Sequence, residues 1–285
     1  MPMKTAPATN AAENATTEAA ERLVEAIRPL GSCAVAFSAG VDSAVVLMAA
    51  RLALGAEHVV AITGVGPALA EGELDEARRV AEAVGVRHVE APTDEIERQG
   101  YVANAPDRCF HCKTELYGKM APLAEQLGLA AVLNGANADD AGDHRPGMRA
   151  ADDYGVRSPL LECGIGKATV RAIASHWDLS VWDKPASPCL ASRIAYGESV
   201  TAEKLARIDA AERRLRSLGL KQVRVRLHPG DVARIEAPLD AIPMLAAEEN
   251  RVRLVAWFRE LGFKAVALDL SGFRSGSLNE LVELS

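Results

Sequence analysis

Segments with the apolar pattern of short buried strands alternate with helical segments through the first two thirds of the chain. The strand patterns cover 33–37, 58–63, 86–91 and 130–134, and the helical patterns cover 17–30, 43–54, 73–84, 109–127 and 167–177. This alternation predicts an α/β fold with a doubly wound parallel sheet. Ligands of such sheets bind at the carboxyl ends of the strands. The polar segment 137–157 is predicted to be a long functional loop.

The proline-containing segment 184–193 reads as a linker between two domains. After it, helical patterns at 201–218 and 242–261 and strand patterns at 222–227 and 265–270 predict a second, smaller α/β domain. We therefore predict a disordered arm over 1–16, a nucleotide-type domain over 17–186 and a second domain over 187–285.

Net charge and hydropathy limit the kinds of molecule that the protein is expected to bind. The 285 residues carry a net charge of −7, which disfavours a nucleic-acid binder and favours a small-molecule substrate. No run approaches the length of a membrane span, and the first residues lack the apolar core of a secretory signal. We expect a cytoplasmic homo-oligomer. Five cysteines in such a chain do not indicate a disulfide framework, and they favour metal binding or catalysis.

A loop rich in small residues follows the first strand and leads directly into a helix. Ser38, Gly40 and Ser43 offer hydroxyl and backbone donors for phosphate at the helix start. Asp42 is a poor phosphate contact by charge and is better suited to Mg²⁺. The alternative is an ordinary strand–helix turn with a Ser or Asp cap.

The sequence Ser-Ala-Gly-Val-Asp-Ser at 38–43 closely resembles the PP-loop, Ser-Gly-Gly-X-Asp-Ser, of the ATP pyrophosphatase superfamily, with Ala39 in place of the first glycine. Four further blocks, at 104–113, 134–140, 184–194 and 268–277, resemble the LarE family of ATP-dependent sulfur transferases. Together these blocks extend over nearly the whole chain after the arm.

This resemblance implies an activity and its cofactors. LarE proteins use ATP to adenylate a carboxylate of pyridinium-3,5-biscarboxylic acid mononucleotide and convert it to a thiocarboxylate, releasing AMP and pyrophosphate. The product is a precursor of the nickel-pincer cofactor of lactate racemase. The implied cofactors are ATP and Mg²⁺, and the implied partner is the mononucleotide substrate.

Cysteines supply the sulfur chemistry. Cys109 and Cys112 form a Cys-X-X-Cys pair at a predicted helix start, where thiolate is favoured, although two buried small residues would give the same pattern. The resemblance makes Cys189 the catalytic residue, through either of two routes. It is a sacrificial donor that becomes dehydroalanine, or it joins Cys109 and Cys112 in holding a 4Fe–4S cluster, the route that we favour narrowly. Cys33 and Cys163 are interpreted as structural, and His111 as a solvated or capping residue.

Polar residues complete the predicted site. Asn137, in the block 134–140, is assigned to cofactor binding. Asp139 and Asp140 are assigned to Mg²⁺ or ribose, with a capping pair as the alternative. Arg224 and Arg226 share one face of a strand and suit a phosphate, with a solvated strand face as the alternative. The resemblance implies that this phosphate is that of the substrate mononucleotide. Ser192 and Arg193, beside Cys189, are assigned to the same phosphate or to lowering the pKa of the thiol. Glu212 is interpreted as an orienting residue, with a surface charge as the alternative, and Lys184 is a candidate for pyrophosphate.

Three other functions fit part of the pattern. An ammonia-dependent PP-loop synthetase would need neither Cys189 nor the Cys-X-X-Cys pair, and a non-catalytic nucleotide-binding module would not consume ATP. A tRNA thiolase is disfavoured by the acidic charge balance and by the absence of zinc-ribbon cysteine pairs.

Overall fold

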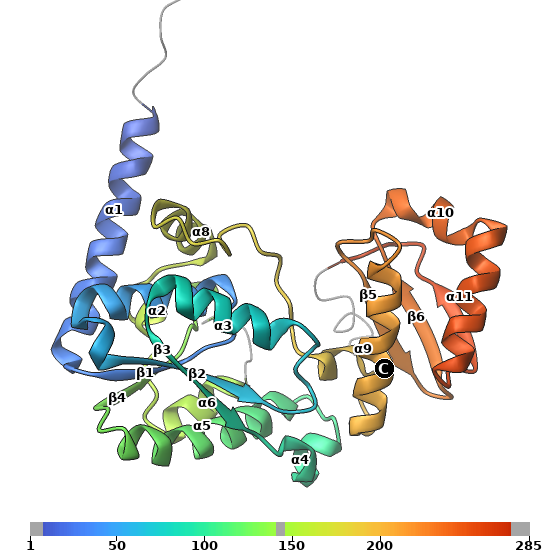
Figure 1. The fold of residues 1–285 in the computed structure, drawn as a ribbon, viewed down its shortest axis with the longest axis horizontal. Helices are drawn as coiled ribbons and strands as arrows, with labels where there is room; N and C mark the ends of the chain where they lie inside the picture. The colour runs from blue at the N-terminus through green and yellow to red at the C-terminus, as the bar shows by residue number, and fades with distance from the viewer. Residues whose placement is uncertain (1–7, 141–145, 275–285) are drawn as a thin grey trace, which may run out of the picture. The chain divides into compact units, whose positions relative to one another are not determined.

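The computed structural model describes residues 8–140 and 146–274, which divide into two compact units (Figure 1). Unit 1 comprises the chain up to Gly66 together with Gly72–Thr93 and Cys109–Ser187. Unit 2 comprises Pro67–Glu71, Asp94–Arg108 and the chain from Pro188 onward. The motif at 104–113 is therefore shared, with Arg108 in unit 2 and Cys109 in unit 1.

Unit 1 is built on a four-stranded parallel sheet in the order β3-β2-β1-β4. The strands are β1 (Cys33–Ala36), β2 (Val59–Val65), β3 (Arg87–Pro92) and β4 (Ala131–Leu133). β1 lies at the centre, with Cys33 opposite Val59 on one side and Ala131 on the other. The predicted α/β class with a parallel sheet is confirmed, and the strand order places a topological switch point between β1 and β4.

Helices cover both faces of this sheet, and α1 and α8 pack on α2 in the outer part of one face. One face carries α1 (Ala8–Ile27), α2 (Val41–Leu54), α3 (Glu73–Val84) and α8 (Lys167–His176). The other carries α5 (Arg108–Gln126) and α6 (Pro146–Asp153). On α1, Ala19, Ala20, Leu23 and Ile27 recur at helical spacing and are buried, which explains why the helix docks.

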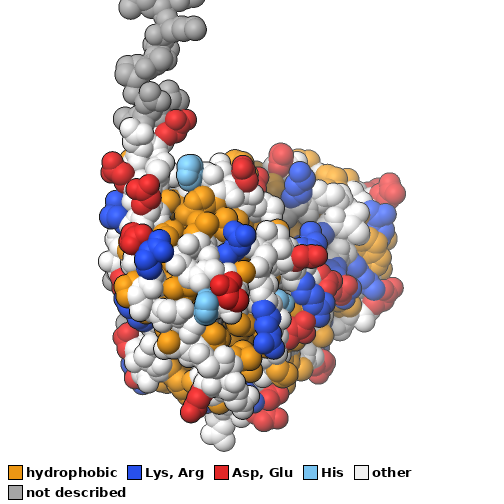
Figure 2. Space-filling model, turned by 60° about the vertical axis from the view of Figure 1, so that its left-hand side comes forward, with side chains coloured by type: hydrophobic (Ala, Val, Ile, Leu, Met, Phe, Trp, Pro, Cys, Tyr) orange, Lys and Arg blue, Asp and Glu red, His pale blue; other side chains and the backbone are white. Residues whose placement is uncertain are grey.

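Short elements connect these helices and strands. They are η1 (Arg28–Leu30), η2 (Ala56–His58), η3 (Glu95–Glu97), α4 (Gln99–Val102), η4 (Ala138–Asp140), α7 (Pro159–Glu162), η5 (Leu190–Arg193) and η6 (Leu239–Ala241). None of the helices within the described ranges has the length and apolar character that crossing a bilayer requires. On the face shown in Figure 2, acidic and basic side chains are interspersed.

Unit 2 contains a three-stranded mixed sheet. Its strands are β5 (Arg224–His228), β6 (Val232–Glu236) and β7 (Ala265–Leu268), with β6 antiparallel to β5 and parallel to β7. Its longer helices are α9 (Ala202–Arg216) and α11 (Glu248–Glu260), and the short α10 (Ile242–Ala246) precedes α11. Strand β6 was not predicted from the sequence. The Gly230-Asp231 pair before it was a usable turn signal, since both residues have positive φ, as a tight hairpin turn requires.

Three local predictions are corrected by the structure. The first helix begins at Ala8, inside the predicted arm, because this alanine-rich stretch has high helix propensity. The predicted helix 242–261 is two helices, since Ala247 has an extended backbone with ψ 142°. The predicted loop 137–157 contains η4 and α6, which starts at Pro146, a residue favoured in a first helical turn. Residues 141–145 of that loop lie outside the described residues.

Candidate active site

The loop between β1 and α2 has the local structure of a phosphate-binding turn. Gly40 caps α2 with an extended backbone, and the Ser43 hydroxyl donates to the Gly40 carbonyl at 3.0 Å. The hydroxyls of Ser38 and Ser43 are 3.3 Å apart, so these predicted residues are brought together. Ala39 has φ 54°, a left-handed conformation that explains why the PP-loop pattern has glycine at this position.

Asp42 is held by two residues from beyond β4. Its Oδ1 accepts a hydrogen bond from Asn137 Nδ2 at 3.2 Å, and its Oδ2 forms an ion pair with Lys167 Nζ. Gly135 permits this approach, because a Cβ there would lie 2.8 Å from the Ser43 nitrogen. The two loops therefore meet at the switch point between β1 and β4, where ligands of doubly wound sheets bind.

Asp139 and Asp140 both bind backbone amides close by. Asp139 Oδ2 accepts from the Lys167 amide at 2.8 Å and so caps α8, while Asp140 Oδ2 accepts from the Asn137 amide at 3.0 Å. These contacts match the capping alternative and fix the loop that carries Asn137. Sequence reasoning missed Lys167, although its place directly after Gly166 at a helix start was a usable signal.

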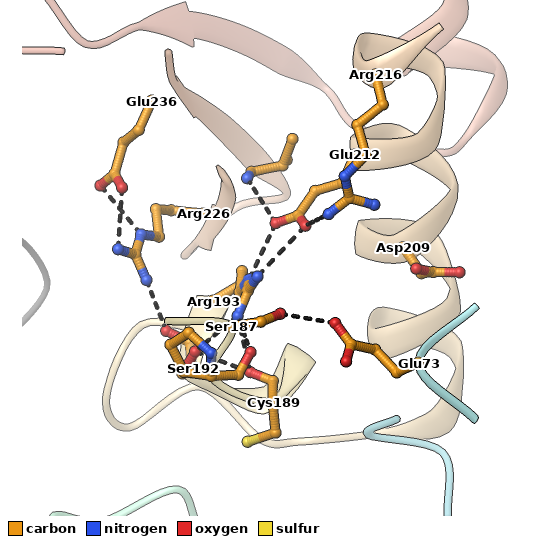
Figure 3. A network of polar contacts seen from close by, with 12 residues as sticks. Glu73, Ser187, Cys189, Ser192, Arg193, Asp209, Glu212, Arg216, Arg226 and Glu236 are labelled. Atoms are coloured by element: carbon orange, nitrogen blue, oxygen red, sulfur yellow. Dashed lines mark hydrogen bonds and ion pairs between the residues drawn. The ribbon is translucent and has the colours of Figure 1, made fainter. Parts of the chain in front are cut away.

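Lys184 lies beside the same phosphate-type loop. Its Nζ is 2.7 Å from Glu76 Oε2, 3.1 Å from Glu73 Oε2 and 3.4 Å from the Ala39 carbonyl oxygen. Ser187 adds a hydrogen bond to Glu73 at 2.9 Å (Figure 3). The two glutamates on α3 therefore hold the last residues of unit 1 against the loop that precedes α2.

The cysteines differ in exposure. Cys33 is fully buried, and burial raises the pKa of its thiol to about 12, which agrees with a packing role. Cys109 is exposed and Cys112 half-buried, one turn apart at the start of α5 in unit 1, whereas the exposed Cys189 belongs to unit 2. Within the described part of either unit, no three His, Cys, Asp or Glu side chains are grouped to hold a metal. Cys163 is half-buried.

Cys189 immediately precedes the short helix η5, and a buried arginine fixes this turn (Figure 3). Arg193 donates through Nη1 to the carbonyls of Pro188 and Cys189, the latter at 3.1 Å. Its Nε donates to Glu212 Oε1 at 2.9 Å, and this fully buried carboxylate also accepts from the Val225 amide at 3.1 Å. Glu212 therefore joins α9, β5 and the Cys189 turn, and its complete burial rules out the alternative of a surface charge.

Arg226 and Arg224 are both buried on β5 but have different partners. Arg226 forms a two-pronged ion pair with the fully buried Glu236, at 3.0 and 2.9 Å, and donates to the Ser192 carbonyl at 2.8 Å. Arg224 stacks on the Phe273 ring at 4.6 Å and makes no hydrogen bond or ion pair with any residue in the described ranges. Burial, with the neighbouring Arg226 and Arg193, lowers the pKa of Arg224 to about 10.

The fold and the loops together define a class of protein. A parallel sheet of order β3-β2-β1-β4, with a serine-rich loop after β1 that carries Asp42, is the arrangement of a PP-loop nucleotide domain. The cysteine-bearing turn in unit 2 is additional to such a domain. No family model matches the chain.

Comparison with known proteins identifies the family. The chain is 38% identical to the pyridinium-3,5-bisthiocarboxylic acid mononucleotide synthase of Lactiplantibacillus plantarum, over 90% of this chain and 92% of that one. An uncharacterized protein of Synechocystis is 44% identical over 92% and 97% of the two chains, and one of Methanocaldococcus jannaschii is 27% identical over 85% and 90%. The protein belongs to the LarE family and is homologous to the synthase enzyme.

Proposed function

We propose that the protein uses ATP to insert sulfur into a carboxylate of pyridinium-3,5-biscarboxylic acid mononucleotide, in biosynthesis of the nickel-pincer nucleotide cofactor. The observation that carries this proposal is the exposed Cys189, held on a turn fixed by buried arginines. A homologue that matches over 90% of this chain and 92% of its own, named as the bisthiocarboxylic acid mononucleotide synthase, supplies the substrate class.

Unit 1 has the groups for the first step. A substrate carboxylate oxygen attacks the α-phosphorus of ATP, so that a C–O–P bond forms and the bond to pyrophosphate breaks. Ser38, Gly40 and Ser43 offer donors to the phosphates, and Asn137 orients Asp42. Asp42 would hold Mg²⁺, whose charge offsets that of the triphosphate, and Mg²⁺ would compete with Lys167 for this carboxylate.

Cys189 has the exposure that the second step needs. Its thiolate attacks the adenylated carbonyl carbon, a C–S bond forms and AMP leaves. In the sacrificial route, a base then removes the Cα proton of Cys189 and the Cβ–S bond breaks. The sulfur stays on the substrate as a thiocarboxylate, and the protein retains dehydroalanine at position 189.

A 4Fe–4S cluster is the alternative sulfur route. Cys109, Cys112 and Cys189 would be its ligands, and a cluster with one iron free of protein ligands would supply a site for sulfide. The donor set suits iron, because all three are cysteine sulfurs outside any disulfide and none is fully buried. The Cys109–Cys112 pair has no other assignment, and for this reason the cluster stays a prediction for this chain.

Arg224 is the group best suited to the substrate phosphate. It is a buried guanidinium without a carboxylate partner in the described part of the chain, and charge-assisted bonds to an anion would satisfy it. Arg226 is already paired with Glu236, and Arg193 with Glu212. Arg193 also donates to the Ser192 hydroxyl, so these side chains support the site through contacts with one another.

Single-turnover assays of cysteine variants test the function and separate the two routes. Cys189→Ala is expected to stop sulfur transfer in both routes. If Cys189 is sacrificial, Cys109→Ala and Cys112→Ala keep one turnover, and mass spectrometry finds the loss of H₂S in the peptide that contains residue 189. If a cluster is used, both variants lose iron together with activity, because an iron loses a covalent ligand.

Cys163→Ala is the matched control, because it removes a half-buried thiol that has no assigned role. It should transfer sulfur like the wild type. Full sulfur transfer by Cys189→Ala would refute the proposed function of this cysteine, and would direct attention to an ammonia-dependent ligase.

A further inference from the structure

Two buried polar residues that precede the Cys-X-X-Cys pair have no role in the chemistry described above. Asn104 is fully buried and Arg108 is 6% exposed, and both belong to unit 2. Arg108 Nη1 donates to Asn104 Oδ1 at 2.6 Å and to the Ala191 carbonyl at 2.7 Å. Ala191 lies two residues after Cys189, in η5, so Arg108 is bound to the turn that presents the thiol.

Asn104 binds the segment that follows this turn. Its Nδ2 donates to the carbonyls of Ala195 at 2.8 Å, Glu198 at 3.0 Å and Ile194 at 3.3 Å. It does so from a left-handed backbone conformation, φ 52°, which asparagine tolerates better than most residues. The Gly197 amide also donates to the Asn104 carbonyl at 3.2 Å. A single side chain thus fixes the exit of the Cys189 turn.

The chemistry of Arg108 is unusual for a buried arginine. Among the described residues it has no carboxylate partner, and its hydrogen bonds go to an amide and a peptide oxygen. A buried guanidinium is ordinarily paired with an acid, because burial of an unpaired charge is costly. Burial of this charge contributes little to the stability of the fold. It indicates that the role of Arg108 is to hold the backbone of the turn in place.

Three arginines from three different elements bind carbonyls of this one turn. Arg193 binds the Cys189 carbonyl at 3.1 Å, Arg108 binds that of Ala191 at 2.7 Å, and Arg226 binds that of Ser192 at 2.8 Å. Arg193 and Arg226 also form ion pairs with the buried Glu212 and Glu236, so their substitution would disturb the core of unit 2. Arg108 alone is directed at the turn and its supporting asparagine, so its substitution can test the turn.

We infer that Arg108, supported by Asn104, is a positioning residue that holds Cys189 in its reactive place; this inference rests on the proposed function. A thiol that must reach an adenylated carbonyl carbon depends on placement, and a displacement of about 1 Å costs on the order of 100-fold in rate. Adenylation of the carboxylate uses groups of unit 1, so loss of Arg108 should affect sulfur transfer far more than pyrophosphate release.

The test uses Arg108→Lys and Asn104→Gly in the full chain. Lysine keeps the charge but lacks the planar guanidinium, whose Nη1 donates both hydrogen bonds. Glycine keeps the positive φ of residue 104 and removes its side-chain bonds. Arg207→Lys is the matched control, since Arg207 is also mostly buried in unit 2 and donates to the Gly262 carbonyl at 3.2 Å.

Single-turnover sulfur transfer is expected to fall about 10- to 100-fold in both variants. Pyrophosphate release should stay within about threefold of wild type when both are assayed well below the melting temperature. Amide hydrogen exchange should rise over residues 189–195 and not over β5 to β7. The Arg207→Lys control should show none of these changes.

Two results would overturn the inference. One is sulfur transfer at the wild-type rate in Arg108→Lys, and the other is an equal fall of pyrophosphate release and sulfur transfer, which would indicate general destabilisation. If the wild type itself transfers no sulfur, the proposed function fails. Hydrogen exchange over residues 189–195 then still decides whether Arg108 fixes the turn.

Discussion

Replacement of Arg224 by methionine should stabilise the protein and weaken substrate binding at the same time. The Arg224 side chain is buried without an acidic partner in the described part of the chain, and its pKa falls to about 10 because of burial and the nearby Arg226 and Arg193. At about 1.4 kcal/mol for each pKa unit, this amounts to at most about 3 kcal/mol of folding free energy. The lost stacking on Phe273 offsets about 1–2 kcal/mol of it.

We therefore expect Arg224→Met to raise the free energy of unfolding by about 1–2 kcal/mol at pH 7. The sign follows from linkage: arginine is charged in both states below about pH 10, so the cost of burying that charge is present throughout that range. The cost decreases as pH rises above 10, and the difference between variant and wild type should shrink there.

Loss of charge-assisted bonds to the substrate phosphate should raise KM about 10- to 100-fold. Urea unfolding at pH 7 and at pH 10.5 measures the stability, and pyrophosphate release against mononucleotide concentration measures KM. Inorganic phosphate should stabilise the wild type more than the variant. A variant that is less stable than wild type and has an unchanged KM would refute the reasoning, because Arg224 would then be a structural cation.

Four further substitutions have definite expected outcomes. Asp42→Ala should abolish pyrophosphate release, while circular dichroism shows a folded protein, because its partly exposed ion pair with Lys167 contributes at most about 1 kcal/mol; normal release would remove Asp42 from the site. Glu236→Gln should lower the free energy of unfolding by about 3–5 kcal/mol, since it leaves the buried Arg226 without its carboxylate. Glu90→Gln, at an exposed pair, should cost under about 1 kcal/mol in the same urea titration, and equal losses would contradict this account. Ala39→Gly should raise the melting temperature slightly, because φ 54° costs alanine about 1 kcal/mol, and a lower melting temperature would show that the buried methyl group matters more.

The parallel sheet and the position of the phosphate-type loop followed from the sequence because their signals are local. Apolar runs of strand length alternate with amphipathic helices, and a serine- and glycine-rich segment follows the first strand. The irregular segment that leads to Cys189 was also predictable, since Pro185 and Pro188 precede it and disfavour a regular element there. Strand β6 was missed because Val232–Glu236 lacks strict alternation, and only its pairing with β5 and β7 makes it a strand.

The partners of the charged residues were decided by the tertiary structure. From the sequence, Arg224 and Arg226 were placed on one strand face and both assigned to a phosphate. The β5–β6 register puts Glu236 opposite Arg224, yet its carboxylate forms the ion pair with Arg226. Lys167 and Asp42 are far apart in the chain and meet because β1 and β4 are neighbours in the sheet. A sequence specifies which groups ionise and which segments are helical, whereas the pairing of buried charges depends on long-range packing that brings distant segments into one low-dielectric interior.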